Sequence, residues 1–326
     1  MIFQIKDKDD STKVIFECLL DKKQYSLEYG AQLGFVILRA IKLKVSLANA
    51  NLRGANLRCA NLRGVKLCPV SFVGADFSGA DFSGANFGVA NFSGGKFIEN
   101  RNLNCADFRY VNFSGANFTR SNLSGLDLSY ANFSSADLSY AYFIDVNLHG
   151  SLFRRARLTE VNFKGANFSS VDLSFTDFRG ANLADVKFDH VYSYLVDLRG
   201  AYLRGANFNN TILCYANLTG ADLCGVKLRD ADLSNADLTG ADLSYGDFRG
   251  TDFNAAGLSN ANLTNANLRG ANLMGADLRG ADLRGVGFED LSLRDVYLNG
   301  STYDRTTIFT NLMYIKIKSY MTFKRS

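Results

Sequence analysis

The stretch ANLMGADLRGADLRGVGF, residues 271–288, carries a large apolar residue at every fifth position. A helix repeats at about 3.6 residues and a strand at 2, so neither element explains a period of five. A small residue stands two positions before each large one, and both point to the same side of an extended segment because side chains alternate. The polar residue between them points outward, and the turn-forming residues that follow let the chain change direction. The large residues are Leu273, Leu278, Leu283 and Phe288.

The same period extends over most of the chain. It runs from Leu47 to Phe97, meets one extra residue in FIENRNLN, and resumes from Leu103 to Ile308. Four turns per circuit give a roughly square coil of about twenty residues, and such coils stack at the strand spacing of about 4.8 Å. The sequence therefore predicts an all-β solenoid of about thirteen coils. We interpret the extra residue near 98–102 as a bulge.

The repeated motifs ANLRGANLRCANL, ADFSGADFSGANF and ADLRGADLRG resemble the pentapeptide repeat family. The resemblance covers roughly residues 47–308. It implies that the solenoid is a right-handed quadrilateral β-helix. It also implies a role in binding, because some members of the family mimic B-form DNA and bind DNA gyrase, which they protect or inhibit.

The two ends differ from the repeats and predict three parts. Residues 1–44 are expected to form an α+β cap, in which the strands MIFQIKD and TKVIFECLL precede an amphipathic helix over residues 25–44. This lead-in is similar to the start of phage- and prophage-encoded members of the family. The β-helix then occupies 45–308, and the basic tail 309–326 caps the open sheet edge of the last coil. A homodimer through an end cap is an alternative use of these ends.

The chain carries no recognisable catalytic motif. It has two histidines, His149 and His190, and no HExxH, GxSxG or phosphate-binding glycine loop. Asp232 and Asp252 are expected to stack like an acid/base pair, but the same positions are Asn or Asp all along the repeats. We therefore expect a protein that is not an enzyme and has no catalytic residue, metal site or cofactor.

Several features indicate a cytoplasmic protein of a bacterial host or a phage. The six cysteines are scattered without a CxxC pair, which is typical of reduced thiols. The start, MIFQIKDKDD, is too charged for a signal peptide. The most apolar window, LGFVILRAIKLKVSL, contains three basic residues, so we expect no membrane span.

Residues twenty positions apart should lie above one another, and this groups the surface charges into three candidate partner-binding sets. A basic ladder has Asp230 and Asp247 nearby, which can relieve its repulsion; it consists of Arg229, Arg249 and Arg269. A basic set lies in the first coil and consists of Arg53, Arg58 and Arg63. An acidic row is interrupted by Asn217 and consists of Asp177, Asp197, Asp237 and Asp277.

Ser193 stands where the repeat requires a Leu. The small side chain predicts a local gap, or a bend over which Tyr192 and Tyr194 fold. Local repacking explains this site without a function, and a partner-binding aromatic patch is the functional interpretation.

The charge balance favours a non-catalytic binding scaffold with protein partners over a DNA mimic that acts on gyrase. Between residues 45 and 308 there are 24 basic and 26 acidic residues. A DNA duplex of about 60 Å carries about 35 negative charges. Mixed charge also argues against direct binding of nucleic acid. The DNA mimic remains the second hypothesis, because a local acidic patch could suffice.

Overall fold

The computed structural model divides into two compact units, Met1–Arg157 and Leu158–Ser326. In both units the chain winds as stacked coils. The residues that the structure describes are 1–67, 69–83, 85–87, 90–98, 106–188, 191–288, 291, 293–308 and 320–324.

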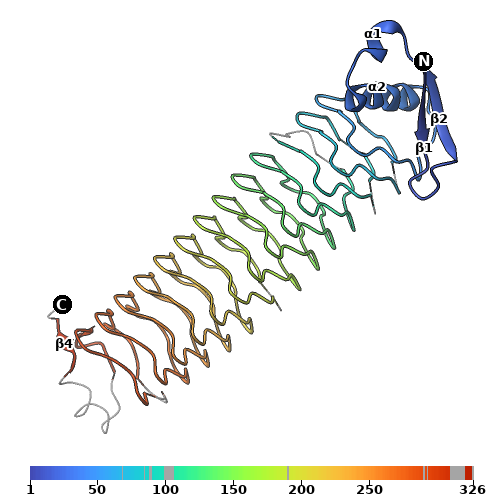
Figure 1. Ribbon diagram of the computed structural model, residues 1–326. Helices are drawn as coiled ribbons and strands as arrows, with labels where there is room; N and C mark the ends of the chain where they lie inside the picture. The colour runs from blue at the N-terminus through green and yellow to red at the C-terminus, as the bar shows by residue number, and fades with distance from the viewer. Residues whose placement is uncertain are drawn as a thin grey trace. The chain divides into compact units, whose positions relative to one another are not determined.

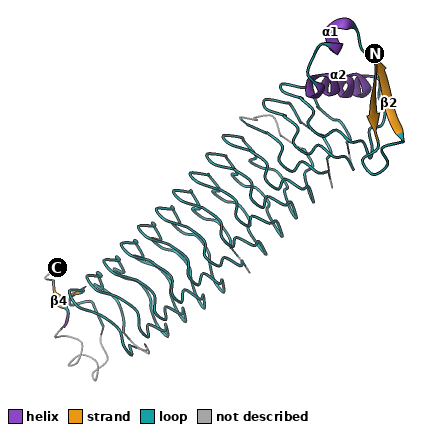
Figure 2. Ribbon diagram, in the orientation of Figure 1, coloured by secondary structure: helices purple, strands orange, loops and turns teal. Residues whose placement is uncertain are grey.

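The first unit begins with a small α+β cap. Strands β1 (Ile2–Lys6) and β2 (Val14–Leu19) pair antiparallel, and helices α1 (Lys22–Tyr25) and α2 (Tyr29–Lys42) follow (Figure 2). Both predicted strands and the main helix are confirmed, although the helix starts later than expected. The short helix α1 was not predicted; it starts with a capping box at Asp21.

Helix α2 lies across the end of the coil stack in the first unit, beside the two strands (Figure 1). Two glycines allow the close approach, because a Cβ on Gly34 would lie 2.0 Å from the carbonyl oxygen of Asn56 and one on Gly30 2.6 Å from that of Gly54. The amide of Asn56 donates to the carbonyl of Gly30 at 2.8 Å. The helix thus covers a sheet edge that would otherwise expose unpaired backbone groups.

Each coil is joined to the next by parallel backbone hydrogen bonds. The amide of Leu233 donates to the carbonyl of Asp252 at 2.7 Å, and the amide of Asp252 donates back to the carbonyl of Ala231 at 2.9 Å. The residue before each large one forms such a pair with the residue twenty positions on, as in Asp232 and Asp252. This spacing confirms that four five-residue repeats complete one coil.

The polar residues of the repeat form its turns. The side chain of Asp232 accepts from the amide of Ser234 at 2.9 Å, and the amide of Ala236 donates to the carbonyl of Leu233 at 3.0 Å. Asn235 adopts the left-handed conformation with φ 58°. Glycine fills the same turn position in many other repeats, because this conformation costs glycine little.

The extra residue of the first unit is visible in the ladder register. Ser71 pairs with Asn91, twenty positions away, whereas Asn86 pairs with Asp107 and Lys96 with Asn117, each 21 positions away. One coil therefore accommodates one more residue without losing the ladder. Residues 99–102, most of the segment interpreted as a bulge, lie outside the described residues.

The core is formed by the two inward positions of the repeats, as predicted, although Leu291, Leu293 and Val296 near the end of the second unit are only half-buried. In the first unit Phe dominates, and rings stack from coil to coil, as between Phe72 and Phe92 at 5.2 Å and between Phe133 and Phe153 at 5.0 Å. In the second unit Leu predominates. Burial of Leu or Phe at about 1.5–3 kcal/mol per side chain is the main stabilising term.

The prediction that Ile308 is a core position was wrong. Its side chain is 53% exposed, while Thr307 is buried instead. Ile308 pairs with Gly287, 21 positions away, whereas Thr302 still pairs with Asp282 at a distance of twenty. One extra residue after Tyr303 therefore turns Ile308 outward, because successive side chains alternate.

The second unit ends in one further short parallel pair. Strand β3 (Thr302–Tyr303) pairs with β4 (Thr322–Phe323), and β4 belongs to the tail that the sequence marked as a capping segment. Residues 309–319 lie outside the described residues. The predicted three-part division of the chain stays a prediction.

Candidate functional site

Six large apolar side chains are exposed on one side of three successive coils in the second unit. Their exposed fractions lie between 40% and 63%. Tyr192 pairs with Ile212 in the ladder, which places them on the same side of consecutive coils. We call this set the aromatic patch; it consists of Phe175, Tyr192, Tyr194, Leu195, Ile212 and Tyr215.

Three of the four rings of the patch form a chain across the coils. Tyr194 contacts Phe175 edge to face, with ring centroids 5.9 Å apart, and contacts Tyr215 in the same way at 5.6 Å. Edge-to-face packing holds the rings in place while leaving part of each accessible to solvent. The patch is therefore an ordered apolar surface.

Three patch residues occupy turn positions that do not suit them. Phe175, Leu195 and Tyr215 have φ of 60°, 53° and 59°. For residues other than glycine this left-handed conformation costs about 1–2 kcal/mol each. On the next side of the same coils the equivalent turns have glycine, at Gly200 and Gly220, and no described atom lies within 4 Å of a Cβ built there. The repeat itself therefore does not require bulky residues at these turns.

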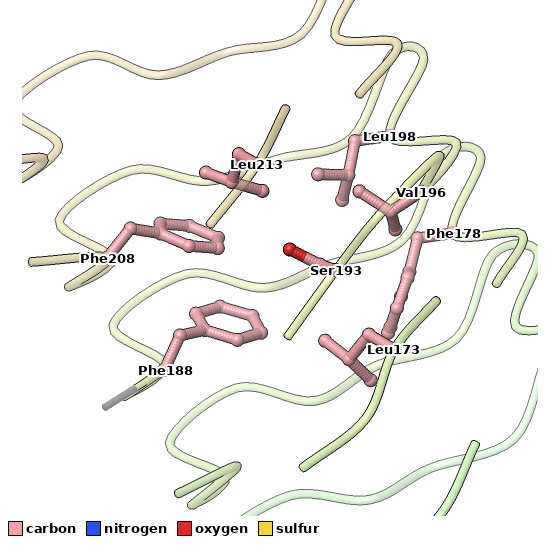
Figure 3. Close-up of a pocket in the computed structure, with 8 residues that line it drawn as sticks. All are labelled: Leu173, Phe178, Phe188, Ser193, Val196, Leu198, Phe208 and Leu213. Atoms are coloured by element: carbon pink, nitrogen blue, oxygen red, sulfur yellow. The ribbon is translucent and has the colours of Figure 1, made fainter. Parts of the chain in front are cut away.

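The predicted gap at Ser193 is confirmed and lies directly beneath the patch. Figure 3 shows the Ser193 side chain among apolar side chains, with Phe188 and Phe208 nearby. The cavity measures about 10 Å³, which is at the lower limit for one water molecule. Its lining consists of Leu173, Phe178, Phe188, Ser193, Val196, Leu198, Phe208 and Leu213.

The backbone stays regular at this gap. The hydroxyl of Ser193 donates to the carbonyl of Ile212 at 2.7 Å, and the amide of Tyr192 donates to the carbonyl of Val171 at 3.1 Å. Tyr192 and Tyr194 flank Ser193 and are exposed, because side chains alternate along the segment. The structure thus has a gap with outward tyrosines rather than the alternative bend.

Within the described part of the chain, the carboxylates on the side of the patch have no basic partner. Asp172, Asp232 and Asp252 form no ion pair with a Lys or Arg among the residues that the structure describes. Asp232 and Asp252 stack in the ladder as predicted, and each accepts a hydrogen bond from the amide two residues on, at 2.9 Å. These contacts give the two carboxylates a role in the turns, and no described basic side chain compensates their charge.

The acidic row is also confirmed as one ladder, but most of its charge is paired. Asp177 pairs with Asp197 in the ladder, and both Asn217 and Gly257 interrupt the row. Three aspartates each form a salt bridge with the arginine two residues on. The nitrogen–oxygen distances are 2.8 Å for Arg179–Asp177, 2.6 Å for Arg199–Asp197 and 2.6 Å for Arg279–Asp277.

These contacts lower carboxyl pKa values in the row. The side-chain hydrogen bonds from Arg279 lower the pKa of Asp277 to about 2. Partial burial acts to raise the pKa of Asp177, but the hydrogen bonds from Arg179 outweigh it and the pKa falls below its usual value. The row therefore consists largely of ionised but neutralised groups.

The structure brings the basic ladder together but not the basic set of the first coil. Asp247 bridges Arg229 at 2.6 Å and Arg249 at 2.8 Å, as the sequence suggested, and Arg269 follows in the next coil.

Arg53, Arg58 and Arg63 instead follow three different ladders, which begin at Asn51, Asn56 and Asn61. Arg58 also lies 3.4 Å from Asp76, and Arg63 lies 3.9 Å from Asp81. They do not form one patch, because residues five positions apart lie on adjacent sides of a coil.

No catalytic or metal-binding arrangement is found among the described residues. His149 contacts Tyr130 edge to face at 5.4 Å, and His190 lies outside the described residues. No cluster of three His, Cys, Asp or Glu side chains could hold a metal within the part of the chain that is described. Over the same residues, no helix is long and apolar enough to cross a membrane.

Sequence reasoning identified Tyr192 and Tyr194 but missed the other four patch residues. The available signal was the twenty-residue offset. Aligning Phe175, Leu195 and Tyr215 by that offset places three bulky apolar residues at a turn position where glycine is common.

Comparison with protein families gives strong repeat matches. A profile described as pentapeptide repeats matches eight copies between residues 102 and 300, and a second profile of the same description matches nine copies over residues 47–96. Among curated proteins, none matches the chain.

Three solved structures illustrate the similarity. HetL, a pentapeptide repeat protein involved in heterocyst differentiation regulation from the cyanobacterium Nostoc sp. strain PCC 7120, is 28% identical over 82% of this chain and 95% of its own, with a TM-score of 0.27. Rfr23 from the cyanobacterium Cyanothece 51142 is 36% identical over 29% of this chain and 64% of its own, with a TM-score of 0.24. Full-length QnrB1, a plasmid-mediated fluoroquinolone resistance protein, is 20% identical over 82% and 98%, with a TM-score of 0.18. The family assignment rests on the repeat profiles.

Proposed function

The chain belongs to the pentapeptide repeat family and has its right-handed quadrilateral β-helix fold, and from this premise we propose that it is a non-catalytic scaffold that docks a protein partner on the aromatic patch. Members of the family are generally structural or binding proteins. In this proposal the protein acts in the cytoplasm of a bacterial host, or is encoded by a phage, and uses no cofactor. Homodimerisation through an end cap stays a prediction.

One observation carries the proposal: bulky apolar side chains are held exposed at turns where they cost free energy. Leu195 and Tyr215 adopt a conformation that glycine would take more cheaply, and their side chains add little to the core because they are exposed. Costly local conformations that the fold does not need are typical of functional surfaces. Ordered aromatic side chains are also the residue type that dominates protein interfaces.

The test compares capture of proteins by the full chain and by a patch variant. Immobilised wild-type chain and the double variant Tyr192→Ser, Tyr194→Ser would be exposed to a bacterial extract, and any captured protein would be purified and titrated. The matched control is Tyr202→Ser, Tyr297→Ser, which removes two exposed tyrosines that lie on other sides of the same unit and outside the left-handed turns. We expect stoichiometric binding that the patch variant loses and the control keeps. If the patch variant still binds the partner as tightly as the wild type does, the proposal is refuted.

A second candidate is DNA mimicry directed at gyrase, favoured by the alignment of four aspartates in one ladder. The arginines beside Asp177, Asp197 and Asp277 weaken this candidate, because a mimic needs uncompensated negative charge. A supercoiling assay with purified gyrase would test it. Inhibition or drug protection that disappears when the four aspartates become Asn would support it, and the absence of any effect would leave the scaffold proposal alone.

A further inference from the structure

The side of the second unit that carries the aromatic patch has two chemically distinct zones along the coil axis. Three coils present the apolar patch, and the next two present Asp232 and Asp252 without a basic partner among the described residues. Residues 171–175, 191–195, 211–215, 231–235 and 251–255 contain three aspartates and no lysine or arginine. The last two coils of this side are therefore negative, whereas the three patch coils are apolar except for Asp172, which lies in the same coil as Phe175.

This polarity points to the chemistry of the partner. An apolar partner surface would bury the rings of the patch, and basic side chains beyond it would meet the uncompensated carboxylates. In the acidic row, by contrast, arginines of the chain itself already pair with the carboxylates. Charge complementarity of this kind fixes orientation and suppresses partners of the wrong sign.

The coil spacing further restricts the shape of the partner. Successive coils lie about 4.8 Å apart, and a helix laid along the axis advances 5.4 Å per turn. Over the four steps from the first patch coil to Asp252, the helix falls out of step by only about 2 Å. An extended segment, whose same-face side chains repeat at about 6.6 Å, falls out of step by about 7 Å.

We propose that the aromatic patch, Asp232 and Asp252 together bind an amphipathic α-helix of a partner protein, with its apolar stripe on the patch and Lys or Arg at the end of the stripe. This inference rests on the proposed scaffold function and names its partner class. About 13 residues of helix would cover the five coils. The helix-in-groove and helix-on-surface modes of recognition use the same stripe of residues every three to four positions.

The experiment uses the full chain and a library of displayed 18-residue helical peptides. In the library, the proximal stripe positions vary among apolar residues and the distal stripe positions vary among Lys, Arg, Gln and Glu. We expect selected peptides to favour Lys or Arg over Glu at the distal positions. We also expect their affinity to fall about tenfold with Tyr194→Ser in the scaffold and about fivefold with Asp232→Asn, Asp252→Asn.

Two controls accompany this experiment. The first tests whether the effect depends on the charges of this side or on the total charge of the protein, and the second tests whether the peptide must be helical. The scaffold variant Asp177→Asn, Asp197→Asn removes the same charge from the acidic row and should leave affinity unchanged. A peptide of the selected composition with a central proline should not bind, because proline breaks the helix.

The outcomes distinguish the inference from the function on which it rests. Patch-dependent binding without preference for basic residues, or binding that survives the proline, would overturn the helix inference and leave the scaffold function intact. Capture of a protein on the patch while no helical peptide binds would likewise overturn the helix inference and leave the scaffold function intact. Self-association in sedimentation experiments that Tyr194→Ser abolishes would show that a second copy covers the patch and would also overturn the inference. If neither peptide nor protein binding depends on the patch, both proposals fail.

Discussion

Two adjacent sides of the second unit are formed by the same repeat and both carry outward aspartates, but they differ in the partners of those aspartates and in the residues at their turns. The acidic row follows each of three aspartates with an arginine and has glycine at several of its turns. The side with the aromatic patch leaves its aspartates without bases among the described residues and has Phe175, Leu195 and Tyr215 at the turns. Their inward positions are equally buried.

The difference shows which positions of the repeat are free to carry function. The two inward positions and the backbone ladder determine the fold, so the three outward positions of each repeat can vary without changing it. On one side this freedom produces a neutral, solvated surface. On the other it produces an apolar and negative surface at a cost in backbone conformation.

The largest expected effect comes from the core that both sides share. Leu233 is fully buried, and Leu233→Asp would place a carboxylate among apolar side chains. We expect a loss of about 3–5 kcal/mol or outright unfolding of the second unit, measured by thermal denaturation followed by circular dichroism. The outward change Asp232→Asn is the control. An unchanged melting temperature for Leu233→Asp would refute the assigned core.

A second prediction concerns variants that give the side with the aromatic patch the arginines of the acidic row. Ser234→Arg and Asn254→Arg would place an arginine two residues after Asp232 and Asp252, as in the acidic row. The new ion pairs should neutralise these carboxylates and weaken binding of a basic amphipathic peptide about tenfold, measured by isothermal titration calorimetry.

The matched control for that prediction is Thr219→Arg, Thr239→Arg, which adds the same charge on the side of the acidic row. If both double variants weaken binding equally, net charge rather than the local aspartates is responsible.

A third prediction concerns the turns. Leu195→Gly and Tyr215→Gly should each stabilise the fold or leave it unchanged, by up to about 1 kcal/mol, because glycine relieves the left-handed conformation. The same changes should weaken partner binding. Conversely, Gly200→Tyr should cost about 1 kcal/mol although space is available. Chemical denaturation gives the free energies of unfolding, and a clear loss of stability in Leu195→Gly would show that the exposed side chain serves the fold.

The smallest effect is the dependence of stability on pH through Asp277. Its pKa of about 2 in the folded chain lies below the value of about 3.9 for an unfolded chain, so the stabilisation is present above about pH 4 and is lost as pH falls towards 2. Solvent screening limits it to about 0.5 kcal/mol. Asp277→Asn should flatten this part of the stability profile between pH 4 and pH 2. A profile identical to that of the wild type would contradict the contribution of the ion pair with Arg279.

The sequence by itself determined the period, the core and the stacking of residues twenty positions apart. This was possible because each repeat obeys the same local rule, so that Leu233, Asp232 and the gap at Ser193 could be placed without coordinates. The rule failed where the register changed. Ile308 turned outward because one extra residue after Tyr303 shifts the alternation, and no pattern in the surrounding letters marks that residue as inserted.

Only the tertiary structure decided which outward residues act together. Arg53, Arg58 and Arg63 are close in sequence but lie on three sides of a coil, whereas Phe175, Tyr194 and Tyr215 are far apart in sequence and touch. The structure also shows that the arginines neutralise the acidic row while Asp232 and Asp252 have no base among the described residues. The physical reason is that the core depends on a local, repeated pattern of burial, whereas a surface depends on contacts between coils and on which charges meet across them.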